Sequence, residues 1–147
     1  MFSFIDNLID KLTGDAVHCT PTMEQYDFIR ANIIAITNGA EKTILVTSSC
    51  MTQAELSEFC ANLTESFRSK GHDSDYVRGC GDSICGYDFI VAAGVQKNAH
   101  AIELARAADC AILVEAKGRS LYPQIEHCKV QLADIGCETI GCVFYDK

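Results

Sequence analysis

Apolar residues recur along the chain in two alternating patterns, which are short continuous runs and longer stretches with helical spacing. The continuous runs are rich in β-branched residues and predict strands that are covered on both faces, as parallel sheets require. Tyr76 and Val77 are expected to be part of one more short strand. The predicted strands are residues 43–47, 89–93, 110–114 and 138–144.

The stretches between these runs place apolar residues three and four positions apart, which is typical of amphipathic helices. The clearest of these stretches carries Leu56, Phe59, Cys60, Leu63 and Phe67. Strands and helices therefore alternate with short connections, which predicts an α/β fold, a mostly parallel sheet with helices on both faces and right-handed crossovers. The predicted helices are residues 22–39, 52–70, 98–108 and 121–135.

Residues 43–56 pass from a buried strand through a small polar turn into a helix, which is the layout of a phosphate-binding loop. The turn has neither the glycine nor the lysine that such a loop uses. Thr52 and Glu55 instead have the spacing of a capping box, in which the two side chains bond to the first backbone N–H groups of the helix. Ser48, Ser49, Thr52 and Glu55 are therefore interpreted as a degenerate phosphate loop, with Glu55 repelling a polyphosphate.

The length of 147 residues predicts one α/β domain over residues 22–147, preceded by an amphipathic segment and linker over residues 1–21. Ile5, Leu8, Ile9 and Leu12 have helical spacing in that segment, and we expect them to pack on the domain or on a partner. No apolar run approaches the ~20 residues that span a bilayer, so a cytoplasmic protein is expected. The net charge of −8 argues against nucleic acid as a partner.

The nine cysteines raise the question of disulfides, metals and reactive thiols. Several of them occupy apolar positions of predicted helices and strands, which favours reduced, buried thiols. Cys80 and Cys85, with His72 nearby, leave open a metal or redox module, although a second close cysteine pair is lacking. Cys50, near a helix N-terminus, leaves open a nucleophilic thiol. The cysteines expected to be buried are Cys60, Cys110, Cys128 and Cys142.

Three stretches resemble the ATP-binding domain of the bacterial tyrosine kinases of capsule and exopolysaccharide synthesis, within the deviant P-loop ATPases of the ParA and MinD type. They are residues 24–32, residues 41–49, and the series of last strands over residues 87–144. The resemblance implies a reduced P-loop NTPase-like fold. It also implies that Glu24 and Arg30 lie at a contact between subunits or with a partner, while Asp27 stands where the family has an arginine.

The resemblance is stronger in the framework than in the motifs. Ala54, Glu55 and Leu56 stand where the family has its glycine, lysine and hydroxyl residue, and Ala93 stands where it has an aspartate that organises Mg²⁺. Asp73 and Asp75 are the nearest remnant of the family's second aspartate motif. Phosphoryl transfer depends on positioning and on neutralising phosphate charge, so these losses together predict a pseudoenzyme.

The resemblance therefore implies a catalytically degenerate protein that acts in polysaccharide biosynthesis or its regulation, with no catalytic residue, metal or cofactor. The implied partners are proteins, among them a membrane-anchored polysaccharide chain-length regulator that would bring the chain to the membrane, and further copies of the chain. Two alternatives stay open. One is an active ATP- and Mg²⁺-dependent tyrosine kinase or ATPase whose site has moved, for instance onto Asp73 and Asp75, and the other is the cysteine module.

Overall fold

The computed structural model describes residues 23–40, 42–72, 74–77, 86–94, 98–116 and 118–145. The predictions for residues 1–21, Thr22, Asp73, Cys80 and Cys85 lie outside this part of the chain. The predicted α/β class is confirmed. Along the chain the elements are α2 (Met23–Ile36), β1 (Thr43–Thr47), α3 (Gln53–Ser69), β2 (Ser74–Val77), β3 (Tyr87–Val91), α4 (Ala99–Ala107), β4 (Cys110–Ala116), α5 (Tyr122–Asp134) and β5 (Thr139–Tyr145).

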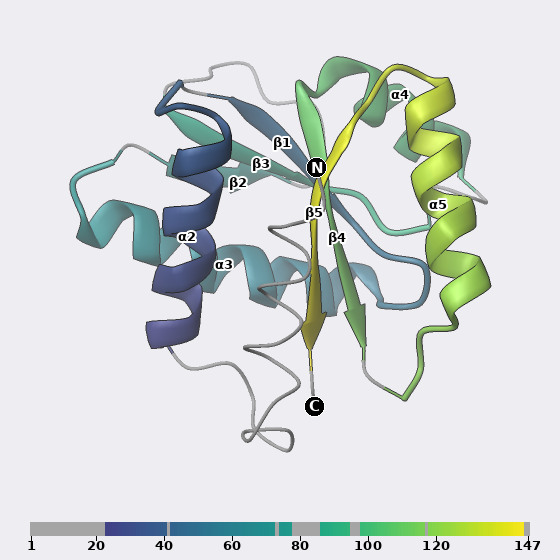
Figure 1. Ribbon diagram of the computed structural model, residues 1–147, viewed down its shortest axis with the longest axis horizontal. Helices are drawn as coiled ribbons and strands as arrows, with labels where there is room; N and C mark the ends of the chain where they lie inside the picture. The colour runs from purple at the N-terminus through teal and green to yellow at the C-terminus, as the bar shows by residue number, and fades with distance from the viewer. Residues whose placement is uncertain are drawn as a thin grey trace.

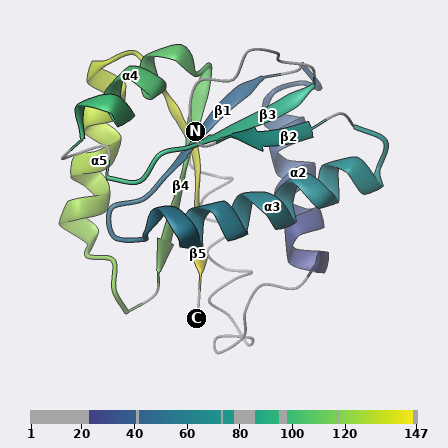
Figure 2. The same ribbon diagram turned by 180° about the vertical axis from the view of Figure 1, so that it is seen from behind.

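The strands form a parallel sheet in the order β2-β3-β1-β4-β5. The connection from β1 through α3 runs toward the β2 edge, whereas the connection from β4 through α5 runs toward the β5 edge (Figure 1). Right-handed crossovers in opposite directions place their helices on opposite faces of the sheet. Figure 2 shows α3 in front of the strands, while α2 packs against α3.

The core lies on both faces of the central strands. Every residue of β1, β3 and β4 is buried, as the continuous apolar runs predict. Phe67 of α3 packs against Tyr87 and Phe89 of β3, and Tyr26 of α2 packs against Phe59 of α3. Cys60, Cys110, Cys128 and Cys142 are buried free thiols, which confirms that prediction, and burial raises the pKa of Cys110 and Cys128 to about 12.

The bounds of β3, β4 and β5 differ from the sequence-based prediction, β5 by one residue at each end. β3 begins at Tyr87 instead of residue 89, since Tyr87 and Asp88 pair with Ser74 and Asp75 of β2. It ends at Val91 instead of residue 93. β4 runs two residues further than predicted, to Ala116, and so includes Glu115. β2 (Ser74–Val77) contains Tyr76 and Val77, which confirms the short strand expected there, and Ser74 at its start donates its hydroxyl to the Tyr87 carbonyl at 2.6 Å.

Candidate functional site

The carboxyl ends of β1 and β4 lie side by side at the point where the two crossover directions diverge. Thr47 pairs with Leu113, so the turn after β1 and the end of β4 are direct neighbours. In open α/β sheets, ligands bind in the crevice at such a switch point. The degenerate phosphate loop predicted from the sequence therefore lies where this fold binds its ligands.

Glu115 occupies this crevice with a fully buried side chain. One carboxylate oxygen accepts the Ser49 backbone N–H at 2.8 Å. The other accepts hydroxyl groups from Ser49 at 2.5 Å, Ser120 at 2.6 Å and Ser48 at 3.3 Å. These donors suit an acceptor-only carboxylate. The loop after β1 thus binds a side-chain carboxyl group of the chain itself.

The following N–H groups of the loop also have acceptors within the chain. The amides of Cys50 and Met51 donate to the Ser48 hydroxyl at 3.1 and 2.9 Å. The Thr52 amide donates to Glu55 at 3.0 Å, and the Glu55 amide donates to the Thr52 hydroxyl at 3.2 Å. The predicted capping box is therefore confirmed. Every backbone N–H from Ser49 to Thr52 is used internally.

Glu55 is paired with Arg119, which lies in the loop after β4. The guanidinium donates to the Glu55 carboxylate at 2.9 Å. This hydrogen bond, and after it the bond from the Thr52 N–H, lowers the pKa of Glu55 to about 2. Arg119 lies near the loop and carries a positive charge, as a phosphate site requires, but its guanidinium already forms an ion pair with Glu55.

The Glu55 carboxylate is expected to make stability depend on pH. Its pKa is depressed from 4.5 to about 2 on folding, so its contribution is present above about pH 4.5 and is lost as the pH falls toward 2. We expect Glu55→Gln to be less stable than the wild-type protein near neutral pH, and the difference to shrink toward zero at low pH. Urea unfolding of both proteins across this range measures it. A difference that stays constant with pH would contradict the assignment.

The Gln53 side chain binds the backbone at the carboxyl end of β3, next to β1. Its side-chain amide donates to the Val91 carbonyl at 2.9 Å and accepts from the Ala93 N–H at 2.9 Å. Ala93 stands where the resembling kinases have an aspartate, and it supplies no carboxylate. Among the residues that the structure describes, no three His, Cys, Asp or Glu residues are grouped as metal ligands.

Of the remaining candidate residues, the structure places Asp75 away from the loop after β1 and Cys50 within it. Asp75 lies within the edge strand β2, separated from β1 by β3, and pairs with Arg68 at 3.3 Å. Cys50 is half-buried, and its sulfur lies 3.0 Å from the Ser120 hydroxyl oxygen and 3.9 Å from a Glu115 oxygen. Its thiol thus has oxygen partners within the chain, and a nucleophilic Cys50 stays a prediction.

Arg30 and Glu24 lie on α2, but only Glu24 is exposed. The Arg30 side chain is 12% exposed, and its guanidinium donates to Asp27 at 2.8 Å and to the Ser66 hydroxyl at 2.8 Å. Asp27, where the family has an arginine, thus has Arg30 as an internal partner. The contact with another subunit stays a prediction.

The sequence matches no known family model and no curated protein. Several solved structures share the fold. One is the chimerical protein CapA2B2. The similarity has a TM-score of 0.70 and covers 97% of this chain and 91% of that chain, at 13% sequence identity. At this identity the likeness establishes the shared α/β fold. In the described residues, no helix is long and apolar enough to cross a membrane.

Sequence reasoning missed the central residue of the site, Glu115. The sequence signal was a charged residue directly after the apolar run of residues 110–114. In the sheet Thr47 pairs with Leu113, so Ser49 and Glu115 each lie two residues beyond that pair. Arg119 gave no local signal, because its partner Glu55 lies 64 residues away in the sequence. Ser120 bonds to Glu115 and Ala116, which lie five and four residues before it.

Proposed function

We propose that this chain is a catalytically inactive relative of the capsule and exopolysaccharide tyrosine kinases, and that it acts through protein contacts. The observation that carries the proposal is the buried Glu115 carboxylate bound to the Ser49 N–H and the three serine hydroxyls. A triphosphate would have to displace this carboxylate and would meet Glu55 beside it. The sequence resemblance and the shared fold with CapA2B2 support the same family.

Phosphoryl transfer requires groups that neutralise the charge of the phosphates and of the transition state. Here Glu55 takes the lysine position, Ala93 takes the position of the metal-organising aspartate, and Arg119 is paired. Each of these three features weakens phosphate binding, and all three lie at the same end of the sheet. Loss of catalysis with retention of the fold is the simplest account of such a site.

The function that remains for such a domain is recognition of other proteins. Polysaccharide biosynthesis or its regulation is the process that the family resemblance implies. A membrane-anchored chain-length regulator is the partner class we favour, and such a partner would hold this chain at the cytoplasmic side of the membrane. No cofactor is part of the proposal, and the charge of −8 makes nucleic acid an unfavourable partner.

Calorimetric titration with Mg-ATP tests the proposal. We expect no saturable heat up to about 1 mM nucleotide, which corresponds to a binding free energy weaker than about −4 kcal/mol. An active P-loop ATPase titrated in the same buffer is the positive control. One-site binding with a dissociation constant in the micromolar range would overturn the proposal.

A further inference from the structure

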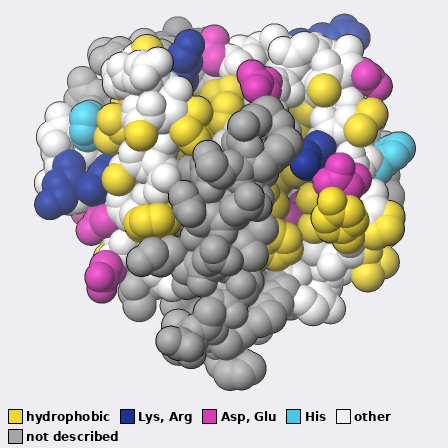
Figure 3. Space-filling view, viewed as in Figure 1, with side chains coloured by type: hydrophobic (Ala, Val, Ile, Leu, Met, Phe, Trp, Pro, Cys, Tyr) yellow, Lys and Arg dark blue, Asp and Glu magenta, His cyan; other side chains and the backbone are white. Residues whose placement is uncertain are grey.

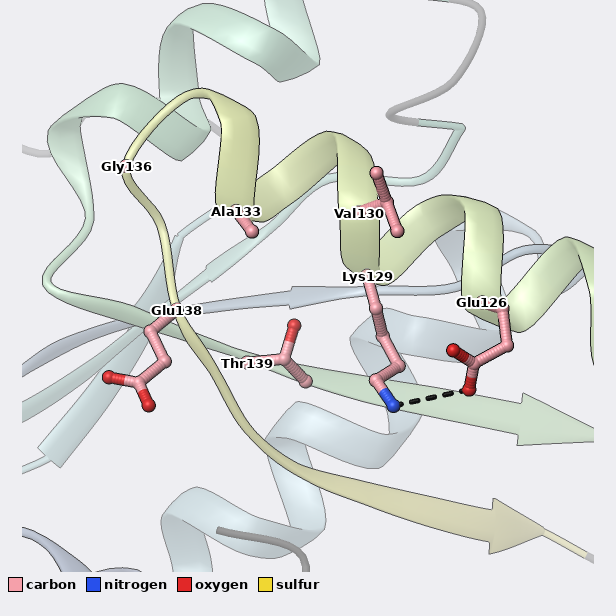
Figure 4. Close-up of a pocket in the computed structure, with 7 residues that line it drawn as sticks. All are labelled: Glu126, Lys129, Val130, Ala133, Gly136, Glu138 and Thr139. Carbon is pink, nitrogen blue, oxygen red and sulfur yellow. Dashed lines mark hydrogen bonds and ion pairs between the residues drawn. The ribbon is translucent and has the colours of Figure 1, made fainter.

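A second site lies at the β5 edge of the sheet, away from the closed crevice. A groove of about 430 Å³ runs between α5 and the start of β5, within the range of typical ligand pockets. Figure 4 shows Lys129 and Ala133 on the α5 side and Thr139 opposite them. Most of the exposed surface area that lines the groove belongs to apolar atoms. The groove is lined by Glu126, Lys129, Val130, Ala133, Gly136, Glu138 and Thr139.

Thr139 brings an unused polar group to this groove. The residue is 5% exposed, and its hydroxyl has no hydrogen-bond partner in the described structure. Figure 4 shows the hydroxyl oxygen directed toward α5, on the groove side of the strand. A buried hydroxyl without a partner costs free energy, which a ligand with a hydrogen-bonding group would recover.

The exposed side of α5 continues the groove with large apolar side chains. Tyr122 is 72% exposed and Val130 is 57% exposed, and they are eight residues apart on the same helix face. Figure 3 shows hydrophobic side chains next to acidic ones over α5. Exposed apolar groups of this size beside a groove are typical of a protein-binding surface.

The charge of the residues around the groove, on α5 and at the start of β5, indicates the charge that a bound peptide would carry. Between Tyr122 and Thr139 the chain carries three acidic residues, Glu126, Asp134 and Glu138, against one lysine or arginine, Lys129. The Lys129 ammonium is already paired with Glu126 at 3.2 Å. The surface therefore has a net negative charge, and a second copy of this acidic chain would be repelled from it.

We propose that the groove between α5 and β5 binds a peptide segment of a partner protein, with an apolar side chain next to a lysine or arginine. The apolar side chain packs against Val130 and Ala133, a polar group of the peptide bonds to Thr139, and the basic residue lies near Glu138. This proposal does not depend on whether the crevice at Glu115 excludes nucleotides.

Selection from a library of displayed random peptides tests the proposal, with the wild-type protein as bait and Ala133→Glu for counter-selection. Enriched peptides are expected to combine apolar and basic residues. A synthetic copy of an enriched peptide should bind Ala133→Glu at least about tenfold more weakly than wild type. Ile36→Glu, an exposed change on α2, is the matched control and should leave the affinity unchanged.

Two milder variants keep the test decisive if Ala133→Glu does not fold. Thr139→Val should raise the melting temperature of the free protein, because it removes an unpartnered hydroxyl, and yet weaken peptide binding several-fold. Glu138→Gln should weaken binding and reduce its salt dependence. Enrichment of acidic peptides, no enrichment over the counter-selection, or equal affinity for wild type and these variants would overturn the proposal.

Discussion

Replacing Glu115 with alanine is expected to lower the free energy of unfolding by about 3 kcal/mol. The substitution leaves the Ser49 N–H and the hydroxyls of Ser49 and Ser120 without their acceptor in a buried crevice. Hydrogen bonds to a charged group contribute more than neutral ones, and unpaired buried donors add a penalty of their own. Urea unfolding followed by circular dichroism measures the change, with an unchanged slope showing that both proteins unfold alike.

Glu65→Gln is the matched control for this substitution. Glu65 is exposed on α3, so its replacement should change stability by less than about 0.5 kcal/mol. If Glu115→Ala is as stable as this control, the carboxylate is not what holds the loop after β1 to the end of β4.

Arg30→Ala is expected to destabilise the protein by about 2 kcal/mol without changing its oligomeric state. The guanidinium joins α2 to α3 through the hydroxyl and the carbonyl of Ser66, and it also donates to Asp27 on α2. The Ser66 hydroxyl, and after it Arg30, lower the pKa of Asp27, so the substitution keeps the Ser66 bond to this carboxylate and removes its counter-charge. Urea unfolding and light scattering of the same samples measure the two effects.

Arg106→Ala, an exposed change near the end of α4, is the control and should cost less than about 1 kcal/mol. The opposite pattern would support the subunit contact that the family resemblance implies. In that case Arg30→Ala would dissociate an oligomer and leave the stability of the monomer unchanged.

The framework of this fold could be predicted from local patterns. A strand buried on both faces needs a continuous apolar run, and β1, β3 and β4 show such runs. The helix start at Thr52 could be predicted because both partners of the capping box lie within four residues of sequence. Buried strands and capping boxes depend on residues that are close together in the sequence, so the sequence alone predicts them.

The centre of the candidate site could not be predicted in the same way. Glu115 and Ser49 are 66 residues apart, and only the pairing of β1 with β4 brings them together. The pairing of Glu55 with Arg119 likewise depends on the loop after β4. Sequence analysis therefore predicted a loop unable to hold phosphate, but it did not find the carboxylate that occupies the crevice.

A crystal structure of the protein grown with Mg-ATP would show whether Glu115 or a phosphate lies between the ends of β1 and β4. We expect Glu115 to be bound to the Ser49 N–H and no phosphate to be present there. Phosphate groups bound to the N–H groups of residues 49–55, with the Glu115 side chain displaced, would contradict this expectation.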